Sequence, residues 1–469
     1  MLLNETIVAL ATPPGSGAIA VIRVSGPKAI DFVAPVFEGR KKIDLRNQET
    51  HSLQLGYIKD GERIIDESLV SVFKGKQSYT GEPTVEISCH GSPFIQQEII
   101  SLMLKQGCRA AKPGEFTMRA FLNGKMDLSQ AEAVADLIAS DNEAAHQMAM
   151  NQMRGGFADE IQNLREELLN FASLIELELD FSEEDVEFAD REEFRSLIFK
   201  IQKTLNRLID SFAVGNVLKK GIPVAIVGEP NAGKSTLLNA LLNEERAIVS
   251  NIAGTTRDTI EDEIAIGGIG FRFIDTAGIR ETTDEIEGLG IQKTFEKIQK
   301  ASIALLMIPS AKLKEEKDVR ETIVEINRLK NRFPDKPFLI VVNKIDLLAP
   351  QKIAELKTRL GEIAGTDLQF ISAKKKIGIE ELKEKLQQYV NTGILRNNDT
   401  IITNSRHYDS LLKAQAEINQ VQNGIDLGLS GDLLAIDIRQ ALYYFGEITG
   451  EITTDDLLGN IFSNFCIGK

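Results

Sequence analysis

The chain has 469 residues, of which 43% are hydrophobic and 26% are charged. This composition is typical of a soluble globular protein, and the length predicts about three domains. The net charge of −15 excludes unspecific binding of nucleic acid by the whole surface, so such a role needs a local basic patch or a partner. No apolar run approaches the roughly 18 residues of a membrane span, and the N-terminus does not resemble a secretory signal. Three scattered cysteines argue against disulfides or a zinc site and fit a reducing cytosol.

Residues 1–118 are expected to form a domain rich in strands. Segments 19–24 and 69–73 are short and largely apolar, and 85–89 alternates apolar with polar residues, which predicts a strand with one buried face. Turn signals separate these segments, and residues 95–104 predict an amphipathic helix. His90 is interpreted as a turn residue rather than a catalytic one.

Residues 119–216 and 392–469 are expected to be helical. Apolar residues recur at spacings of three and four in both segments, which predicts helices with one buried face. They are Ile161, Leu164, Leu168, Phe171 and Ile175 in the first segment and Leu411, Ala414, Ile418, Val421 and Ile425 in the second. Because such a face needs a partner helix, we expect both segments to build one helical domain into which residues 217–391 are inserted. The acidic run at 176–193 is interpreted as a solvated surface.

The inserted segment contains GEPNAGKS at residues 228–235, which matches the P-loop pattern G-x-x-x-x-G-K-[ST] at every fixed position. A predicted strand precedes the motif and a predicted helix follows it, so backbone N–H groups and a helix N-terminus point at one phosphate site. Lys234 is expected to contact the outer phosphates, and Ser235 to bind Mg²⁺. Further apolar runs at 303–308 and 338–342 predict a doubly wound α/β domain.

Four further motifs follow the P-loop, three of them directly after predicted strands. DTAG at 275–278 is placed to hold the Mg²⁺ shell, and the threonines of IAGTTRD at 252–258 suit a switch that senses the γ-phosphate. In NKID at 343–346, Asp346 has the chemistry to accept from N1–H and the 2-amino group of guanine. SAK at 372–374 again follows a strand and is expected to pack on the base. The order of these motifs resembles that of the Ras-like GTPases.

Outside the G domain, PGEFTMRAFLNGK at 113–125 and CIGK at 466–469 are not motifs of GTPases at large. Together with Asn231 in the P-loop and GTTRD at 254–258, they resemble the tRNA-modifying GTPase family MnmE, also called TrmE, from residue 11 to the chain end. The resemblance implies an N-terminal folate-binding and dimerisation domain at 1–118, a discontinuous helical domain at 119–216 and 392–469, and a Ras-like, doubly wound G domain at 217–391. The fold class is therefore expected to be multidomain, with both α/β and α+β parts.

The resemblance also implies a function. The family member would be a K⁺-activated GTPase in the cytoplasm that forms a homodimer through its N-terminal domain. With the flavoprotein MnmG, in a heterotetramer, it would modify C5 of the wobble uridine, position 34, of certain tRNAs. The product would be an aminomethyl-type group made with 5-formyl- or methylene-tetrahydrofolate.

Two alternatives stay open. An Era-like GTPase would act as an RNA-binding or ribosome-assembly switch, which a basic C-terminal RNA-binding domain would favour; this chain instead ends in an acidic helical stretch. A folate-binding aminomethyltransferase with an appended GTPase would be favoured by folate binding without any need for MnmG.

The resemblance also implies site residues, which are assigned at the positions where this sequence matches the motifs of the family. The GTP site would comprise Asn231, Ala232, Gly233, Lys234, Ser235, Thr236, Ser250, Asn251, Ile252, Ala253, Gly254, Thr255, Thr256, Asp275, Thr276, Ala277, Gly278, Asn343, Lys344, Asp346, Ser372, Ala373 and Lys374. Mg²⁺ would bind Ser235 and Thr256, and K⁺ would bind Asn231, Ser250, Ile252 and Thr255. Position 250 is commonly Thr in the family, so Ser250 is a small departure. Coordination of K⁺ through the backbone oxygen of this residue would not be affected by it.

The residue after DTAG is Ile279, where a Ras-type GTPase has a glutamine that orients the attacking water. The resemblance assigns this role to Glu287, with Arg280 in the same switch and Lys234 as the remaining catalytic candidates of the G domain. Folate would be bound by Arg23, Glu82, Lys125 and Lys469. Cys466 is a candidate nucleophile toward C6 of uridine.

Overall fold

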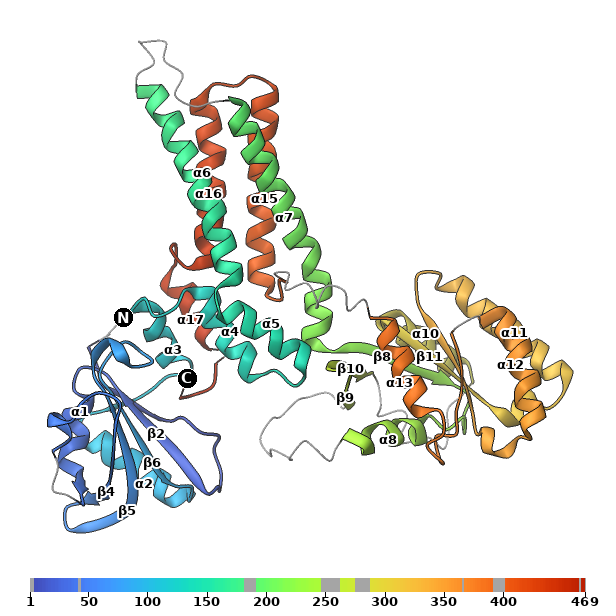
Figure 1. Cartoon of the computed structure of the whole chain (residues 1–469), viewed down its shortest axis with the longest axis horizontal. Helices are drawn as coiled ribbons and strands as arrows, with labels where there is room; N and C mark the ends of the chain where they lie inside the picture. The colour runs from blue at the N-terminus through green and yellow to red at the C-terminus, as the bar shows by residue number, and fades with distance from the viewer. Residues whose placement is uncertain are drawn as a thin grey trace. The chain divides into compact units, whose positions relative to one another are not determined.

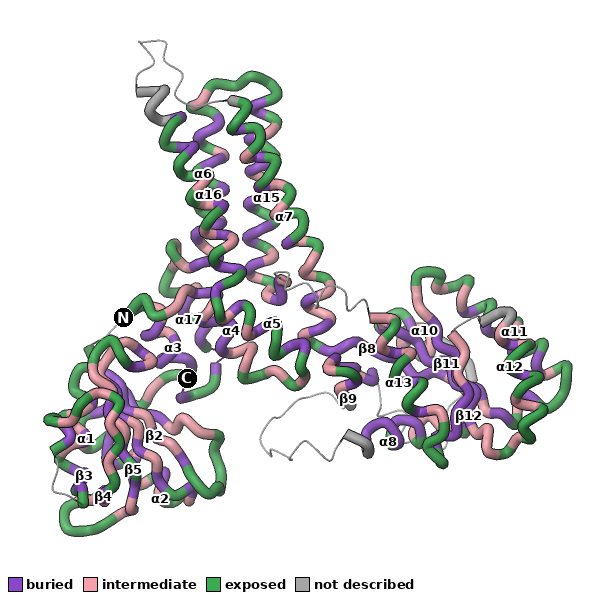
Figure 2. The backbone as a smooth tube through the Cα atoms, viewed as in Figure 1, coloured by how far each residue is buried: buried purple, intermediate pink, exposed green. Residues whose placement is uncertain are grey.

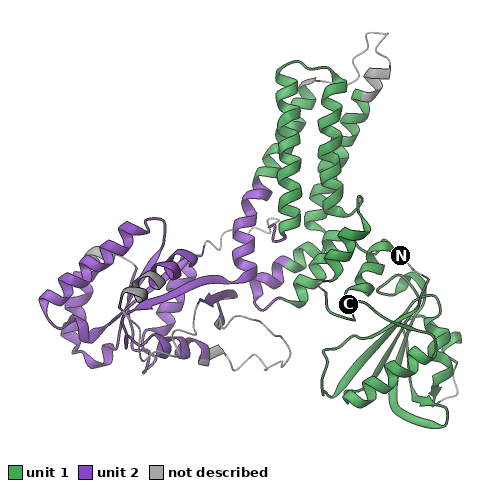
Figure 3. Ribbon diagram, turned by 180° about the vertical axis from the view of Figure 1, so that it is seen from behind, with its two compact units in different colours: residues 1–139, 149–206, 405–469 green, residues 140–148, 207–404 purple. Residues whose placement is uncertain are grey.

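The computed structural model describes residues 4–40, 44–180, 191–245, 262–274, 287–364, 367–390, 401–463 and 465–468 (Figure 1). The chain divides into two compact units, which Figure 3 colours separately. The first comprises residues 1–139, 149–206 and 405–469, and the second comprises residues 140–148 and 207–404. Among the described helices, none has a stretch apolar and long enough to cross a membrane.

A seven-stranded sheet in the order β3-β4-β5-β6-β2-β1-β7 dominates the N-terminal part of the first unit. Its strands are β1 (Ile7–Leu10), β2 (Ile19–Ser25), β3 (Phe37–Gly39), β4 (Ser52–Asp60), β5 (Arg63–Phe73), β6 (Thr84–His90) and β7 (Arg109–Ala110). The strands predicted at 19–24, 69–73 and 85–89 are thus all present. Neighbouring strands run antiparallel, except that β1 and β7 are parallel.

The two faces of this sheet differ in burial. Alternate strand residues such as Ile22, Val70 and Ile87 form a core with α1 (Ala29–Val33) and α2 (Pro93–Lys105), the latter at the predicted position. The opposite face exposes Leu53, Leu55 and Leu69, of which Leu55 and Leu69 are direct cross-strand partners. One sheet face is therefore covered within the unit, and the other carries apolar residues that the described residues leave exposed.

The rest of the first unit is helical. It contains α3 (Glu115–Leu122), α4 (Leu128–Ile138), part of α5 (Glu143–Met153), α6 (Gly156–Asp180), the beginning of α7 (Arg191–Lys220), α15 (Ser405–Asp426), α16 (Gly431–Thr449) and α17 (Asp455–Ser463). The bundle of α6, α7, α15 and α16 buries both apolar seams predicted from spacing (Figure 2). Segments on either side of the inserted domain thus build one bundle, as expected. The predicted boundaries at 118 and 216 would cut through α3 and α7.

The second unit contains a six-stranded sheet in the order β13-β12-β11-β8-β10-β9, in which only β9 is antiparallel to its neighbour. Its strands are β8 (Ile222–Gly228), β9 (Asp262–Ile266), β10 (Ile269–Phe273), β11 (Ile303–Pro309), β12 (Phe338–Asn343) and β13 (Leu368–Phe370). Its helices are α8 (Lys234–Glu245), α10 (Glu287–Lys300), α11 (Glu316–Arg332), α12 (Pro350–Ala364) and α13 (Ile379–Gln388). Short 3₁₀ helices connect elements in both units at Ala34–Val36, Leu45–Asn47, Gly75–Gln77, Ser310–Leu313 and Ile345–Leu347.

Helices cover both faces of this sheet. In β8, Val224 and Ile226 face a core shared with α8 and α13, whereas Ala225 and Val227 face a core shared with α10, α11 and α12. This alternation explains why the strands are continuous apolar runs. The predicted doubly wound α/β fold is confirmed, and the P-loop follows the central strand β8.

Candidate functional site

Two glycines allow the P-loop to lie close to its neighbours. Gly228 and Gly233 have φ angles of +151° and +98°, which side chains other than hydrogen rarely tolerate. A Cβ at Gly228 would overlap the carbonyl oxygen of Met307, and one at Gly233 would overlap the side-chain nitrogen of Asn343. The fixed glycines of the motif are therefore required by packing as well as by backbone conformation.

Lys234 begins α8 and folds back onto the loop. Its Nζ donates hydrogen bonds to the carbonyl oxygens of Gly228 and Glu229, at 2.7 and 2.9 Å. Burial lowers the pKa of Lys234, the charge of Lys297 lowers it further, and Glu229 opposes the shift. The ammonium group is thus held against the P-loop backbone, where a phosphate-binding lysine is needed.

Asn343 joins three of the predicted motifs. Its Nδ2 donates to the carbonyl oxygen of Ala232 at 2.8 Å, and its Oδ1 accepts from the backbone N–H of Ala373 at 3.1 Å. The neighbouring Lys344 extends its Nζ to the carbonyl oxygen of Asn231, at 2.7 Å. These contacts bring P-loop, NKID and SAK motifs together, although more than 100 residues separate the first two.

Asp346 lies beside this junction. Its Oδ1 accepts from Ser372 Oγ at 2.7 Å, and this hydrogen bond is the main cause that lowers the pKa of the half-buried carboxyl. Lys375 and Lys374 lower the pKa further by their charge. The hydrogen bond from Ser372 is made to Oδ1, so Oδ2 can accept from a ligand. A carboxylate in this state suits the paired N–H donors of guanine.

Several predicted residues lie outside the described part of the chain. They are Ser250, Asn251, Ile252, Ala253, Gly254, Thr255, Thr256, Asp275, Thr276, Ala277, Gly278, Ile279, Arg280 and Lys469. Glu287 is the first residue of α10, but its side chain is not described. Ser235 and Thr236 lie in the first turn of α8, where a hydroxyl group is suited to a divalent cation. The side chain of Asn231 makes no hydrogen bond with the described residues.

Arg23 is held in place within the first unit. Its Nε donates to Glu86 Oε1 at 2.9 Å, and its guanidinium lies 5.3 and 5.6 Å from the ring centres of Tyr79 and Phe116. Its Nη1 donates to the carbonyl oxygen of Gly468, at 3.4 Å. The contact with residue 468 brings the chain end to a residue of β2.

The C-terminal segment is docked by backbone contacts. Gly468 has a φ of +100°, and a Cβ there would overlap the Leu10 carbonyl oxygen. The N–H of Gly114, at the start of α3, donates to the carbonyl oxygen of Cys466 at 3.4 Å. Cys466 itself is exposed and free. Cys89 and Cys108 are also free, but burial raises their thiol pKa values to about 11 and about 12, so they are poor nucleophiles.

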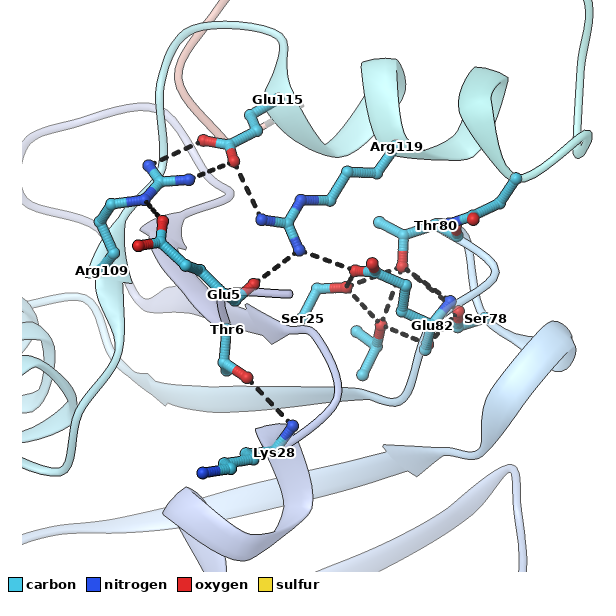
Figure 4. A network of polar contacts seen from close by, with 12 residues as sticks. Glu5, Thr6, Ser25, Lys28, Ser78, Thr80, Glu82, Arg109, Glu115 and Arg119 are labelled. Carbon is cyan, nitrogen blue, oxygen red and sulfur yellow. Dashed lines mark hydrogen bonds and ion pairs between the residues drawn. The ribbon is translucent and has the colours of Figure 1, made fainter. Parts of the chain in front are cut away.

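Glu82 belongs to a network of buried charges (Figure 4). Its Oε2 accepts from Nη1 of Arg119 at 2.9 Å, and Arg119 also pairs with Glu115 at 3.0 Å. Lys125 packs beside the same loop: its Nζ donates to the Lys76 carbonyl oxygen at 2.9 Å. Glu82 and Lys125 were predicted from the sequence as members of the folate set, whereas Arg119 and Glu115 were not. The signal for the last two was the motif at 113–125, which contains both.

Comparisons with known proteins agree with this arrangement. The family model for the "GTP-binding protein TrmE N-terminus" matches residues 6–125, and the "MnmE helical domain" model matches residues 128–466. Among similar proteins, the tRNA modification GTPase MnmE of Christiangramia forsetii is 67% identical over 474 residues and that of Flavobacterium psychrophilum 64% over 469, with 100% of each chain covered. The MnmE of Cytophaga hutchinsonii is 55% identical, covering 99% of this chain and 98% of its own.

A likeness to a solved structure is much weaker. Era in complex with a segment of 16S ribosomal RNA is 30% identical over 42% of this chain and 66% of its own, with a TM-score of 0.27. The full-length relatives, by contrast, share the N-terminal, helical and G-domain parts of this chain. The resemblance predicted from the motifs at 113–125 and 228–235 is confirmed, and this chain belongs to the MnmE family of tRNA modification GTPases.

Proposed function

We propose that this chain is a K⁺-activated GTPase of the cytoplasm that acts with an MnmG-type flavoprotein. Together, in a heterotetramer, they modify C5 of the wobble uridine, position 34, of certain tRNAs to an aminomethyl-type group, with a tetrahydrofolate derivative as one-carbon donor. The observation that carries the GTP part is the junction at Asn343, which ties the P-loop to the base-binding motifs beside Asp346. Membership in the family supports the tRNA part.

Hydrolysis must proceed without the glutamine of Ras-type enzymes, because Ile279 cannot form a hydrogen bond with water. We assign that role to Glu287, with Arg280 as a further cation of the same switch. Mg²⁺ held by Ser235 and Thr256 would neutralise charge on the phosphates.

K⁺ would stabilise the charge that develops on the phosphoryl oxygens. Asn231 would hold it together with Ser250, Ile252 and Thr255. The position of Asn231 supports this: Lys344 holds its backbone carbonyl, while no described residue hydrogen-bonds to its side-chain amide.

The folate part rests on the first unit. Arg23 lies in β2, Glu82 in the loop before β6, and Lys125 in the loop between α3 and α4. Lys469 is the next residue after Gly468, whose carbonyl oxygen accepts from Arg23. The cations suit the carboxylates of a folate tail, and the carboxylate suits the amino edge of a pterin. Cys466, exposed near this set, is the proposed nucleophile toward C6 of uridine.

The homodimer would form through the N-terminal domain. The open face of its sheet carries Leu53, Leu55 and Leu69, which are at least 40% exposed. Covering such a face with its counterpart in a second copy would remove apolar area from water.

GTP hydrolysis in K⁺ and Na⁺ at equal ionic strength tests the G-domain proposal. We expect hydrolysis to be at least about tenfold faster in K⁺, because the ion supplies electrostatic stabilisation of the transition state. Glu287→Ala should lower the K⁺-dependent rate about a hundredfold while GTP affinity is kept, because water positioning acts only in the transition state. Glu296→Ala, an exposed position on the same helix, is the matched control.

Equal rates in both salts would exclude the K⁺ mechanism, and full activity of Glu287→Ala would exclude that residue. The tRNA part is tested by mass spectrometry of tRNA nucleosides after incubation with the flavoprotein, GTP and 5-formyl- or methylene-tetrahydrofolate. A modified uridine formed without the flavoprotein would favour the aminomethyltransferase alternative.

A further inference from the structure

One face of α3 contacts two members of the proposed folate set, Arg23 and Glu82, and the loop that carries Glu82. Phe116, Arg119 and Asn123 recur at spacings of three and four, so they lie on one side of the helix. The Phe116 ring packs on Arg23, Arg119 pairs with Glu82, and Asn123 Nδ2 donates to the Thr80 carbonyl oxygen at 2.7 Å. The helix therefore supports Arg23 and Glu82, and Arg119 is the charged residue on this face of the helix.

Arg119 is fixed by contacts on several sides (Figure 4). Its side chain is 1% exposed, and it donates to the Glu5 carbonyl oxygen at 2.8 Å, to Glu82 at 2.9 Å and to Glu115 at 3.0 Å. Glu115 is in turn held by Arg109 and by the backbone N–H of Lys112. Burial alone would raise the pKa of Glu115, but these hydrogen bonds outweigh it and leave the pKa lowered. A buried guanidinium between two carboxylates has little freedom to move.

The contact with Arg119 involves one of the two carboxylate oxygens of Glu82. Its Oε2 accepts from Arg119, and Ser25 Oγ lies 3.5 Å from the same oxygen. The backbone of Glu82 is also held, since Ser78 Oγ donates to its carbonyl oxygen at 2.5 Å and its N–H donates to Thr80 Oγ1 at 3.3 Å. No hydrogen bond from a described residue reaches Oε1. The carboxylate is thus oriented, with one oxygen available as an acceptor.

We propose that Arg119 is a positioning residue of the folate site, an inference that rests on the proposed folate function. It fixes the Glu82 carboxylate so that Oε1 accepts from the N–H donors on the amino edge of the pterin. The positive charge also matters, because it balances a carboxylate that is 13% exposed and would otherwise be costly to bury. Arg119 itself does not contact the ligand.

Titration of the full chain with 5-formyl-tetrahydrofolate tests this role. Glu82→Gln and Arg119→Gln should each weaken binding about tenfold to a hundredfold, the range for a lost hydrogen bond to a charged group. In the double variant the two losses should not multiply, because Arg119 acts through Glu82. Arg119→Lys, which keeps the charge, should be intermediate. Arg40→Gln is the control: this arginine is 56% exposed and pairs with Glu67, away from the contacts of Arg119, so the variant should bind folate like the wild type.

The outcomes separate the two proposals. A wild-type chain that binds no folate would overturn the folate function, and the role of Arg119 with it. Loss of binding in Glu82→Gln with unchanged binding in the Arg119 variants would overturn only the positioning role. So would losses that multiply in the double variant, or an equal loss in Arg40→Gln. If Arg119→Gln does not fold, the same cycle is run with Arg119→Lys.

Discussion

Asp346 offers one carboxylate oxygen to a ligand, because Ser372 already occupies the other at 2.7 Å. Asp346→Asn replaces an acceptor by an amide that can also donate. GTP affinity should fall about a hundredfold, since the amide N–H of the new Asn would face an N–H donor of guanine instead of accepting from it. Xanthosine triphosphate, which carries a carbonyl group where guanine has its amino group, should gain affinity.

Competition between the two nucleotides for the same chain measures the change. Ser372→Ala is the control: it loosens the carboxylate without changing its chemistry, so it should weaken GTP binding by less and gain nothing for xanthosine triphosphate. An Asp346→Asn variant that still prefers GTP would contradict the assignment of the base site.

Residues could be predicted from the sequence where a motif fixes both type and spacing. Asn343, Asp346 and Lys234 belong to such motifs, and the structure brings them together in one unit. Arg119 also lies in a motif, at 113–125, but its role could not be assigned from the sequence, since its partner Glu82 is 37 positions away and no spacing rule links the two.

At the scale of elements, the bundle helices were predictable because buried positions repeat every three or four residues. The polar contacts that hold these helices together were not predictable. Glu132 of α4 accepts from Arg406 Nε at 3.0 Å and lies 2.6 Å from His407 Nε2, both at the start of α15. Arg406 also donates hydrogen bonds to the carbonyl oxygens of Glu447 and Ile448 on α16. Three helices that are far apart in the sequence thus meet at one buried carboxylate.

Burial alone would raise the pKa of Glu132, but His407 and then Arg406 outweigh it and lower the pKa to about 2. Because the folded pKa lies below the unfolded one near 4.5, the carboxylate stabilises the fold fully above that pH. The contribution, about 3 kcal/mol for a shift of this size, is lost as the pH falls toward 2. Glu132→Gln should therefore be less stable than the wild type at pH 7, and the gap should shrink as the pH falls from about 4.5 to about 2.

Denaturant unfolding at several pH values, with the wild-type curve subtracted, measures this gap. Asp409→Asn, an exposed carboxylate on α15, is the control and should show little difference at any pH. A gap for Glu132→Gln that stays constant across the window would show that the residue stabilises by packing and not by its charge.

At the scale of the whole molecule, the sequence predicted that the G domain interrupts one helical domain. The reason was that the helices on either side of it each carry an apolar seam that needs a partner. The exact boundaries were not predictable, because α3 and α7 continue through them without a change in composition. The meeting of the chain ends was also hidden from spacing: Arg23 and Gly468 are 445 positions apart, and their contact is made through a backbone carbonyl that any residue carries.

That contact makes residue 468 a sensitive position. Gly468 has a φ of +100°, and a Cβ would overlap the Leu10 carbonyl oxygen, so Gly468→Ala should displace the last residues from β1 and from Arg23. If Lys469 contributes to folate binding as proposed, affinity for 5-formyl-tetrahydrofolate should fall about tenfold, comparable to the loss of one charge-assisted contact. Deletion of residues 466–469 should give a loss at least as large. GTP hydrolysis in the absence of folate should be unchanged in both.

Ile467→Ala is the matched control, because this neighbouring side chain is 60% exposed and should have little effect. Wild-type folate affinity in Gly468→Ala would show that the docked chain end takes no part in binding.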